Sequence, residues 1–245
     1  MRKLVRISEN EVIAEFLKGE FYHREYDRDR RDFETLVHDP HLNDEAENAL
    51  RRALLFRRRA TMWRELPPDT QWWEIQLDPQ DLDHINVFPR AQWRSIAQGN
   101  FRALHVAELI RRHFDPAKPN DLSAKIHALR TLMRMEGPRF TILLIGLDEI
   151  RPATVLEGNH RFVASLLLPT DIMMRRLRVV CGFSMGMEKC CWYKTSLANL
   201  SRYLKNRIQH LWAREADAKL LLPQTARGRV SEDYARAGLP SAKSK

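Results

Sequence analysis

The chain has 245 residues, of which 44% are hydrophobic and 30% are charged, and its formal net charge at pH 7 is +9. At roughly 150 residues per domain, this length fits one large domain or a domain with a sizeable extension. The apolar content and six tryptophans exclude a globally disordered chain, and the positive charge favours an anionic partner such as a nucleotide, a phosphorylated substrate or nucleic acid.

Membrane and metal classes are also constrained. The longest apolar run, residues 142–147, has the length of a strand, whereas a bilayer span needs about 20 apolar residues. The first six residues lack the apolar segment of a signal peptide, so we expect a cytoplasmic protein without a membrane partner. Three cysteines, Cys181, Cys190 and Cys191, do not suffice for a disulfide framework or a four-thiolate zinc site.

The first quarter of the chain, residues 8–66, predicts helices. Ser8 and Glu11 form a capping-box pattern, and apolar residues recur behind them at helical spacing. A second helix after Pro40 carries five arginines, at positions 51, 52, 57, 58 and 59. They are interpreted either as an anion-binding or nucleic-acid face, or as a solvated helix side balanced by nearby acids such as Glu47, and we favour the second interpretation.

After Pro67 and Pro68 the pattern becomes mixed. Strands are predicted at 72–77, 140–145, 153–156 and 177–183, and helices at 91–98, 103–113, 122–135, 162–168 and 195–212, with a loop at 115–120. These elements predict an α+β fold with a small mixed sheet and surrounding helices. We divide the chain into an N-terminal helical extension (1–66), a main domain (67–222) and a disordered tail from 223 onward.

The order strand, Glu157-Gly158-Asn159-His160-Arg161, helix is typical of a phosphate-binding turn. The first amides of a helix lack internal partners, and the helix dipole favours an anion there. Gly158 allows close backbone approach, Asn159 and His160 add polar groups, and Arg161 offers a fork of donors suited to phosphate. The alternative is an ordinary helix start, with Asn159 as its cap and Arg161 in a salt bridge.

Residues 140–183 resemble the ParB/sulfiredoxin superfamily, in which two strands lead into a glycine-led turn that ends in arginine. Gly158-Asn159-His160-Arg161 is similar to the sulfiredoxin turn Gly-Cys-His-Arg and to the ParB turn Gly-Glu-Arg-Arg. Upstream, Pro89-Arg90 resembles the Gln-Pro-Arg box of ParB proteins, with Phe88 in place of glutamine. The resemblance covers roughly residues 72–185 and implies a sheet of ParB/sulfiredoxin type that binds nucleotide through this turn and Arg90.

Two departures limit the activity that the resemblance implies. Asn159 stands where sulfiredoxins have their nucleophilic cysteine, which excludes sulfiredoxin chemistry, and where ParB proteins have a glutamate linked to nucleotide hydrolysis. The helix-turn-helix domain that usually follows the ParB nucleotide domain has no convincing counterpart after residue 185.

A phosphotransferase also needs a base for the acceptor hydroxyl and acidic ligands for magnesium. Glu157 adjoins the turn, and Glu74 and Asp81 lie on the first strand of the main domain and its exit, where kinase-like members of the superfamily place acids. Each has an ordinary alternative, as a strand-end carboxylate or a solvated loop acid. The polar-aromatic run around Tyr193 and Thr195 is either the lining of a substrate pocket or part of the core.

Three hypotheses follow. The first is a nucleotide-binding protein that uses ATP or another nucleotide, with Mg²⁺, to phosphorylate a hydroxyl of a small molecule. The second is a nucleotide-gated, ParB-like DNA-binding protein, motivated by the basic charge and the arginine-rich helix. The third is a non-catalytic interaction protein that keeps the fold without the activity. We favour the first.

Overall fold

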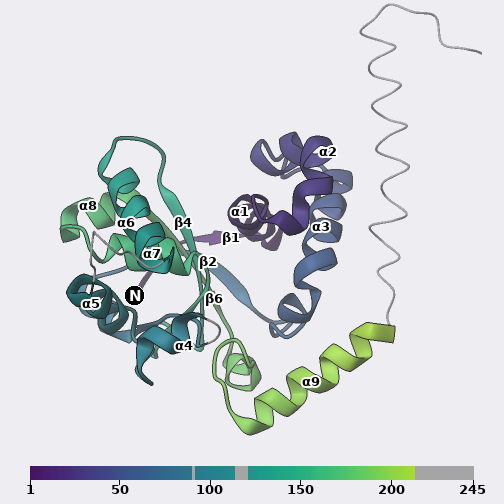
Figure 1. Ribbon diagram of the computed structural model, residues 1–245. Coiled ribbons are helices and arrows are strands. Elements are labelled where there is room, and N and C mark those ends of the chain that lie inside the picture. Colours follow the sequence, from purple (N-terminus) through teal and green to yellow (C-terminus); the bar gives the residue numbers. More distant parts are fainter. Residues whose placement is uncertain (90–91, 114–120, 213–245) are drawn as a thin grey trace, which may run out of the picture.

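The computed structural model describes residues 1–89, 92–113 and 121–212. A central sheet is covered by helices on both faces, as Figure 1 shows. In chain order the elements are β1 (Arg2–Ile7), α1 (Glu9–Glu20), η1 (Arg24–Tyr26), α2 (Asp27–His38), α3 (Glu45–Trp63), β2 (Gln71–Gln76), η2 (Pro79–His84), β3 (Ile85–Asn86), α4 (Gln92–Ala97), α5 (Ala103–His113), α6 (Asp121–Arg134), β4 (Phe140–Gly146), β5 (Ala153–Glu157), α7 (Asn159–Ser165), α8 (Thr170–Arg176), β6 (Leu177–Phe183), η3 (Met185–Lys189) and α9 (Leu197–Trp212).

The sheet has six strands in the order β1-β2-β6-β4-β5-β3. The pairs β4–β6 and β3–β5 are parallel, and the other three pairs are antiparallel. The predicted α+β class and mixed sheet are therefore confirmed. The predicted strands at 72–77, 140–145, 153–156 and 177–183 correspond to β2, β4, β5 and β6.

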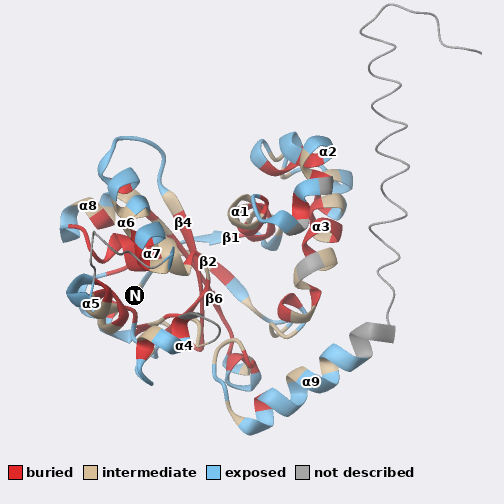
Figure 2. Cartoon of the chain, viewed as in Figure 1, coloured by how far each residue is buried: buried red, intermediate tan, exposed pale blue. Residues whose placement is uncertain are grey.

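Two apolar cores lie on opposite faces of the sheet. Helices α4 to α8 pack on one face and α1 to α3 on the other, and buried residues line both sides of the central strands in Figure 2. In β4, Ile142 and Leu144 belong to the first core and Leu143 and Ile145 to the second. This double burial explains why β4 reads as a continuous apolar run rather than as an alternating pattern.

The N-terminal segment differs from the predicted helical extension. Residues 2–7 form β1, which pairs antiparallel with β2 at the edge of the sheet. Leu4 and Val5 remain exposed, so no hydrophobic alternation marked this segment as a strand. Helix α1 begins after Ser8, whose hydroxyl accepts from the Glu11 amide at 3.2 Å, as predicted. Its apolar side joins the second core, so residues 1–66 share a core with the sheet.

The arginine-rich helix is α3, and four of its arginines, Arg51, Arg52, Arg57 and Arg59, make ion pairs within the protein. Arg51 is buried and donates to the Leu36 and His41 carbonyls at 3.2 and 3.0 Å. Arg57 pairs with Asp29, and Arg59 with Glu20. These contacts agree with neutralisation by nearby acids, although Arg51 is buried rather than solvated.

Around the turn, α7 begins at Asn159, three residues before the predicted start, and α8 fills the interval before β6. The helix predicted at 195–212 is α9. The predicted tail from 223 lies outside the described residues, as does the whole of the predicted loop at 115–120. Among the helices that the structure describes, none combines the length and the apolar character needed to cross a bilayer.

Candidate functional site

The predicted turn is built around Gly158. Its backbone is left-handed, with φ 91° and ψ 21°, a conformation that favours glycine. A Cβ added at this position would also come within 2.9 Å of Ile142 Cδ1. Conformation and close packing both therefore require glycine here, and the chain enters α7 directly from the buried end of β5.

Asn159 fastens the turn to the segment that follows β3. Its side-chain oxygen accepts from the Phe88 backbone amide at 2.8 Å, and its side-chain nitrogen donates to the Val155 carbonyl at 3.5 Å. Both contacts are within the chain, so the Asn159 side chain holds two segments together. The neighbouring His160 ring packs against Trp93 of α4, with the ring centroids 5.1 Å apart.

Arg161 folds back onto the turn and pairs with Glu157, which is on β5. The side chains of Arg161 and Glu157 are 21% and 12% exposed. Helix α1 covers the pair, because a Cβ on Gly19 would lie 2.7 Å from both Arg161 Nη2 and Glu157 Oε1. The alternative interpretation of Arg161, as a member of a salt bridge, is the arrangement that the structure has.

Two titratable groups of the turn have shifted pKa values. Burial raises the pKa of Glu157 to about 7, with Arg161 opposing the shift and Glu20 adding to it. Burial lowers the pKa of His160 to about 4, and the charges of Lys125, His23 and Arg161 act in the same direction. His160 is therefore neutral at pH 7 and can act there as a hydrogen-bonding group but not as a cation.

The other predicted catalytic acids lie elsewhere. Glu74 pairs with Arg178 at 2.8 Å, and strand register places it three strands from Glu157, in the row Glu74–Val180–Leu143–Glu157. At about 4.8 Å per strand, that separation is roughly 14 Å. Asp81 accepts from the N-terminal amine of Met1 at 2.8 Å. The three acids are not brought together, and Arg90 lies outside the described residues.

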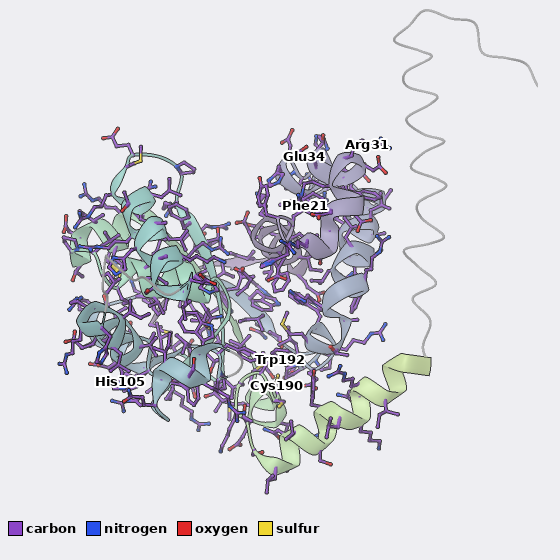
Figure 3. All side chains as sticks on the ribbon, in the orientation of Figure 1. Phe21, Arg31, Glu34, His105, Cys190 and Trp192 are labelled. Carbon is purple, nitrogen blue, oxygen red and sulfur yellow. The ribbon has the colours of Figure 1, made fainter. Side chains whose placement is uncertain are left out.

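A pocket of about 650 Å³ lies at the β3 edge of the sheet. The lining residues are polar or small for the most part: Asn86, Val87, Pro89, Arg94, Gly99, Asn100, Phe101, Arg102, Thr154, Tyr193 and Thr195. We call it the β3 pocket. Tyr193 and Thr195 come from the polar-aromatic run for which the sequence left a pocket lining as one interpretation. The segment between η3 and α9 also contains Trp192, whose ring stacks on that of Phe88 with the centroids 4.7 Å apart. Figure 3 labels Trp192 and Cys190 in this segment.

The β3 pocket is positively charged. Arg94 and Arg102 are exposed at its wall, and neither guanidinium makes an ion pair with another residue that the structure describes. None of the described lining residues carries a carboxylate. Gly99 has φ +88° and open space where a Cβ would stand, so this part of the wall is bare backbone. Such a lining suits an anionic ligand.

The turn and the β3 pocket are connected through the backbone. Phe88, the residue held by Asn159, lies between Val87 and Pro89, which both line the pocket. Thr154 lines it from β5, three residues before the turn. Sequence reasoning missed Arg94, Asn100 and Arg102, since isolated arginines and asparagines near a short helix carry no motif. Gly99-Asn100 was the one local signal, because this pair is typical of an exposed turn.

Within residues 1–89, 92–113 and 121–212, no group of three or more histidine, cysteine or acidic side chains is arranged to hold a metal ion. No protein-family model, no curated protein and no solved structure matches this chain.

Proposed function

We propose that this protein binds a nucleotide, or a similar phosphate-bearing small molecule, in the β3 pocket. The observation that carries the proposal is a pocket of about 650 Å³ with two guanidinium groups and no carboxylate among its described lining residues. That volume lies in the range of small-molecule sites. Arg94 and Arg102 are the proposed phosphate ligands, because guanidinium groups match phosphate geometry.

The ParB/sulfiredoxin resemblance supports the same ligand class. Apart from the additional helix α8 before β6, the chain order β4, β5, a left-handed glycine, α7 and β6 is the order that the resemblance implies. The role of the turn differs from the one first expected. Arg161 faces Glu157 and α1, so we assign the turn to holding the pocket wall through Asn159 and Phe88, and the phosphate contacts to Arg94 and Arg102.

The proposal is one of binding and does not include phosphoryl transfer. Transfer would need a carboxylate near the reacting groups, and the acids Glu74, Asp81 and Glu157 are in ion pairs away from the lining. The described lining offers no carboxylate to Mg²⁺ either, so a magnesium ion in this pocket would be held by the phosphates of the nucleotide itself.

Titration calorimetry with ATP, ADP, CTP and GTP, with and without Mg²⁺, tests the proposal. Loss of one charge-assisted hydrogen bond costs about 1.5–3 kcal/mol, so Arg102→Ala and Arg94→Ala should each weaken binding about tenfold or more. Arg175→Ala is the matched control, since Arg175 is an exposed arginine of α8 whose ion-pair partner is Asp171.

Three results would reject the proposal. One is a wild-type protein that binds none of the four nucleotides at millimolar concentration. Another is normal affinity in both pocket variants. If Arg161→Ala alone abolishes binding in a protein that remains folded, the phosphate site is the turn and the β3 pocket has been wrongly assigned.

A further inference from the structure

Helix α9 presents its apolar side chains to solvent. Leu197, Leu200, Leu204 and Ile208 are 87%, 37%, 49% and 58% exposed. At 100° per residue these four side chains fall within an arc of about 80°. We call them the apolar stripe. Single exposed apolar residues are normal on a protein surface, whereas a contiguous exposed stripe points to an interaction site.

The polar side of α9 attaches it to the rest of the protein. Asn199 is buried and donates to the carbonyls of Glu188 and Lys194, both at 2.9 Å. Arg202 donates to the Lys189 carbonyl at 2.9 Å, and Tyr203 packs edge-on against Trp192. Because these contacts fix the helix through its polar side, the apolar stripe faces away from the segment that holds α9.

The charges on α9 are of one sign. Arg202, Lys205 and Arg207 are exposed, and residues 197–212 include no aspartate or glutamate. On a helical projection, Lys205 and Arg207 flank the apolar stripe on opposite sides. An apolar stripe flanked by basic residues is complementary to a surface with an apolar interior and a negatively charged boundary.

The same features argue against a second copy of the chain as the occupant. Two α9 helices packed together would bring basic residues against basic residues. The helix has 16 residues and is therefore about 24 Å long. One face about 10 Å wide offers roughly 240 Å², well below the about 800 Å² per partner of a standard interface. A helix that lies in a lipid surface requires neither a binding groove nor a buried area as large as that of a standard protein interface.

We propose that α9 binds the surface of an anionic lipid bilayer, with the apolar stripe at the headgroup boundary and Lys205 and Arg207 on lipid phosphates. Helix α9 lies at the periphery of the molecule, away from the central sheet (Figure 1). This proposed surface association differs from the expectation of no membrane partner and is independent of the β3 pocket. It involves no crossing of the bilayer.

Co-sedimentation of the full chain with lipid vesicles tests this. We expect binding to vesicles of phosphatidylglycerol and phosphatidylcholine in equal parts, weakening with salt, and little binding to phosphatidylcholine alone. Leu204→Glu should reduce binding about tenfold or more. It removes an apolar side chain that would insert into the bilayer and adds a negative charge that the anionic lipid repels. Leu132→Glu on α6 is the matched control, because Leu132 is also 49% exposed and the added charge is the same.

Thermal unfolding of both variants checks that they fold. The proposal is overturned if the wild-type protein does not bind the anionic vesicles, or if it binds them and the phosphatidylcholine vesicles equally. An equal loss of binding in Leu204→Glu and Leu132→Glu also overturns it. Sedimentation equilibrium measures whether two copies of the chain associate through the apolar stripe. A dimer that Leu204→Glu dissociates and Leu132→Glu preserves would make the stripe a self-association surface and would also overturn the lipid assignment.

Discussion

Two partly buried titratable groups of the Gly158 turn should give opposite dependences of stability on pH. The pKa of His160 is lowered from 6.5 to about 4, and the pKa of Glu157 is raised from 4.5 to about 7, in both cases by burial before any other cause. Charged groups around them include Glu20, Arg59, Lys125, His23 and Arg161. Replacing each titratable residue by glutamine removes its proton equilibrium and keeps a polar side chain.

The sign follows from which state binds the proton more tightly. The lowered pKa of His160 means that its contribution is present above pH 6.5 and is lost as pH falls through about 4. The raised pKa of Glu157 means that its contribution is present below pH 4.5 and is lost as pH rises through about 7. Each pKa moves by about 2.5 pH units, and 1.36 kcal/mol per pH unit gives at most about 3 kcal/mol for each group.

Urea unfolding between pH 4 and 7.5 measures these contributions as differences from the wild-type protein. Relative to wild type, the unfolding free energy of His160→Gln should rise by up to about 3 kcal/mol as pH falls from 6.5 to 4. That of Glu157→Gln should rise by a similar amount as pH increases from 4.5 to 7. In the double variant the two trends should largely offset each other. Differences that stay constant across this pH range in the two single variants would refute the reasoning.

Two further substitutions test packing inside the protein. Gly19→Ala should change the unfolding free energy by less than about 1 kcal/mol, because the side-chain ends of Arg161 and Glu157, 2.7 Å from the new Cβ, can shift and alanine favours the helix; a loss above about 2 kcal/mol in urea unfolding would show that α1 holds this pair rigidly. Arg51→Ala should cost about 3–5 kcal/mol, since it leaves the buried Leu36 carbonyl and the buried Asn48 side-chain oxygen without this donor and removes the ion pair with Glu47. The exposed Arg52→Ala is its control, with an expected loss below about 1 kcal/mol, and equal losses in the two variants would contradict the buried role of Arg51.

Local features of this protein could be predicted from its sequence because neighbouring residues decide them. Ser8 caps α1 through the Glu11 amide, and the apolar run of β4 signals a strand buried on both faces. Gly158 marks the left-handed entry to α7. In each case the determining interaction lies within a few residues or within the burial pattern of one element, so a short stretch of sequence is enough to identify it.

The tertiary structure decided how the functional groups are used. The sequence places Arg161 at a helix start and allows either a phosphate contact or a salt bridge, whereas the structure pairs its guanidinium with Glu157 next to Gly19 of α1. The β3 pocket gathers residues from positions 86–102, 154 and 193–195, and Asn199 turns the apolar side of α9 outward through hydrogen bonds to two carbonyls. Such contacts depend on which surfaces meet when distant segments pack. Local propensities and residue spacing do not determine which distant surfaces these are.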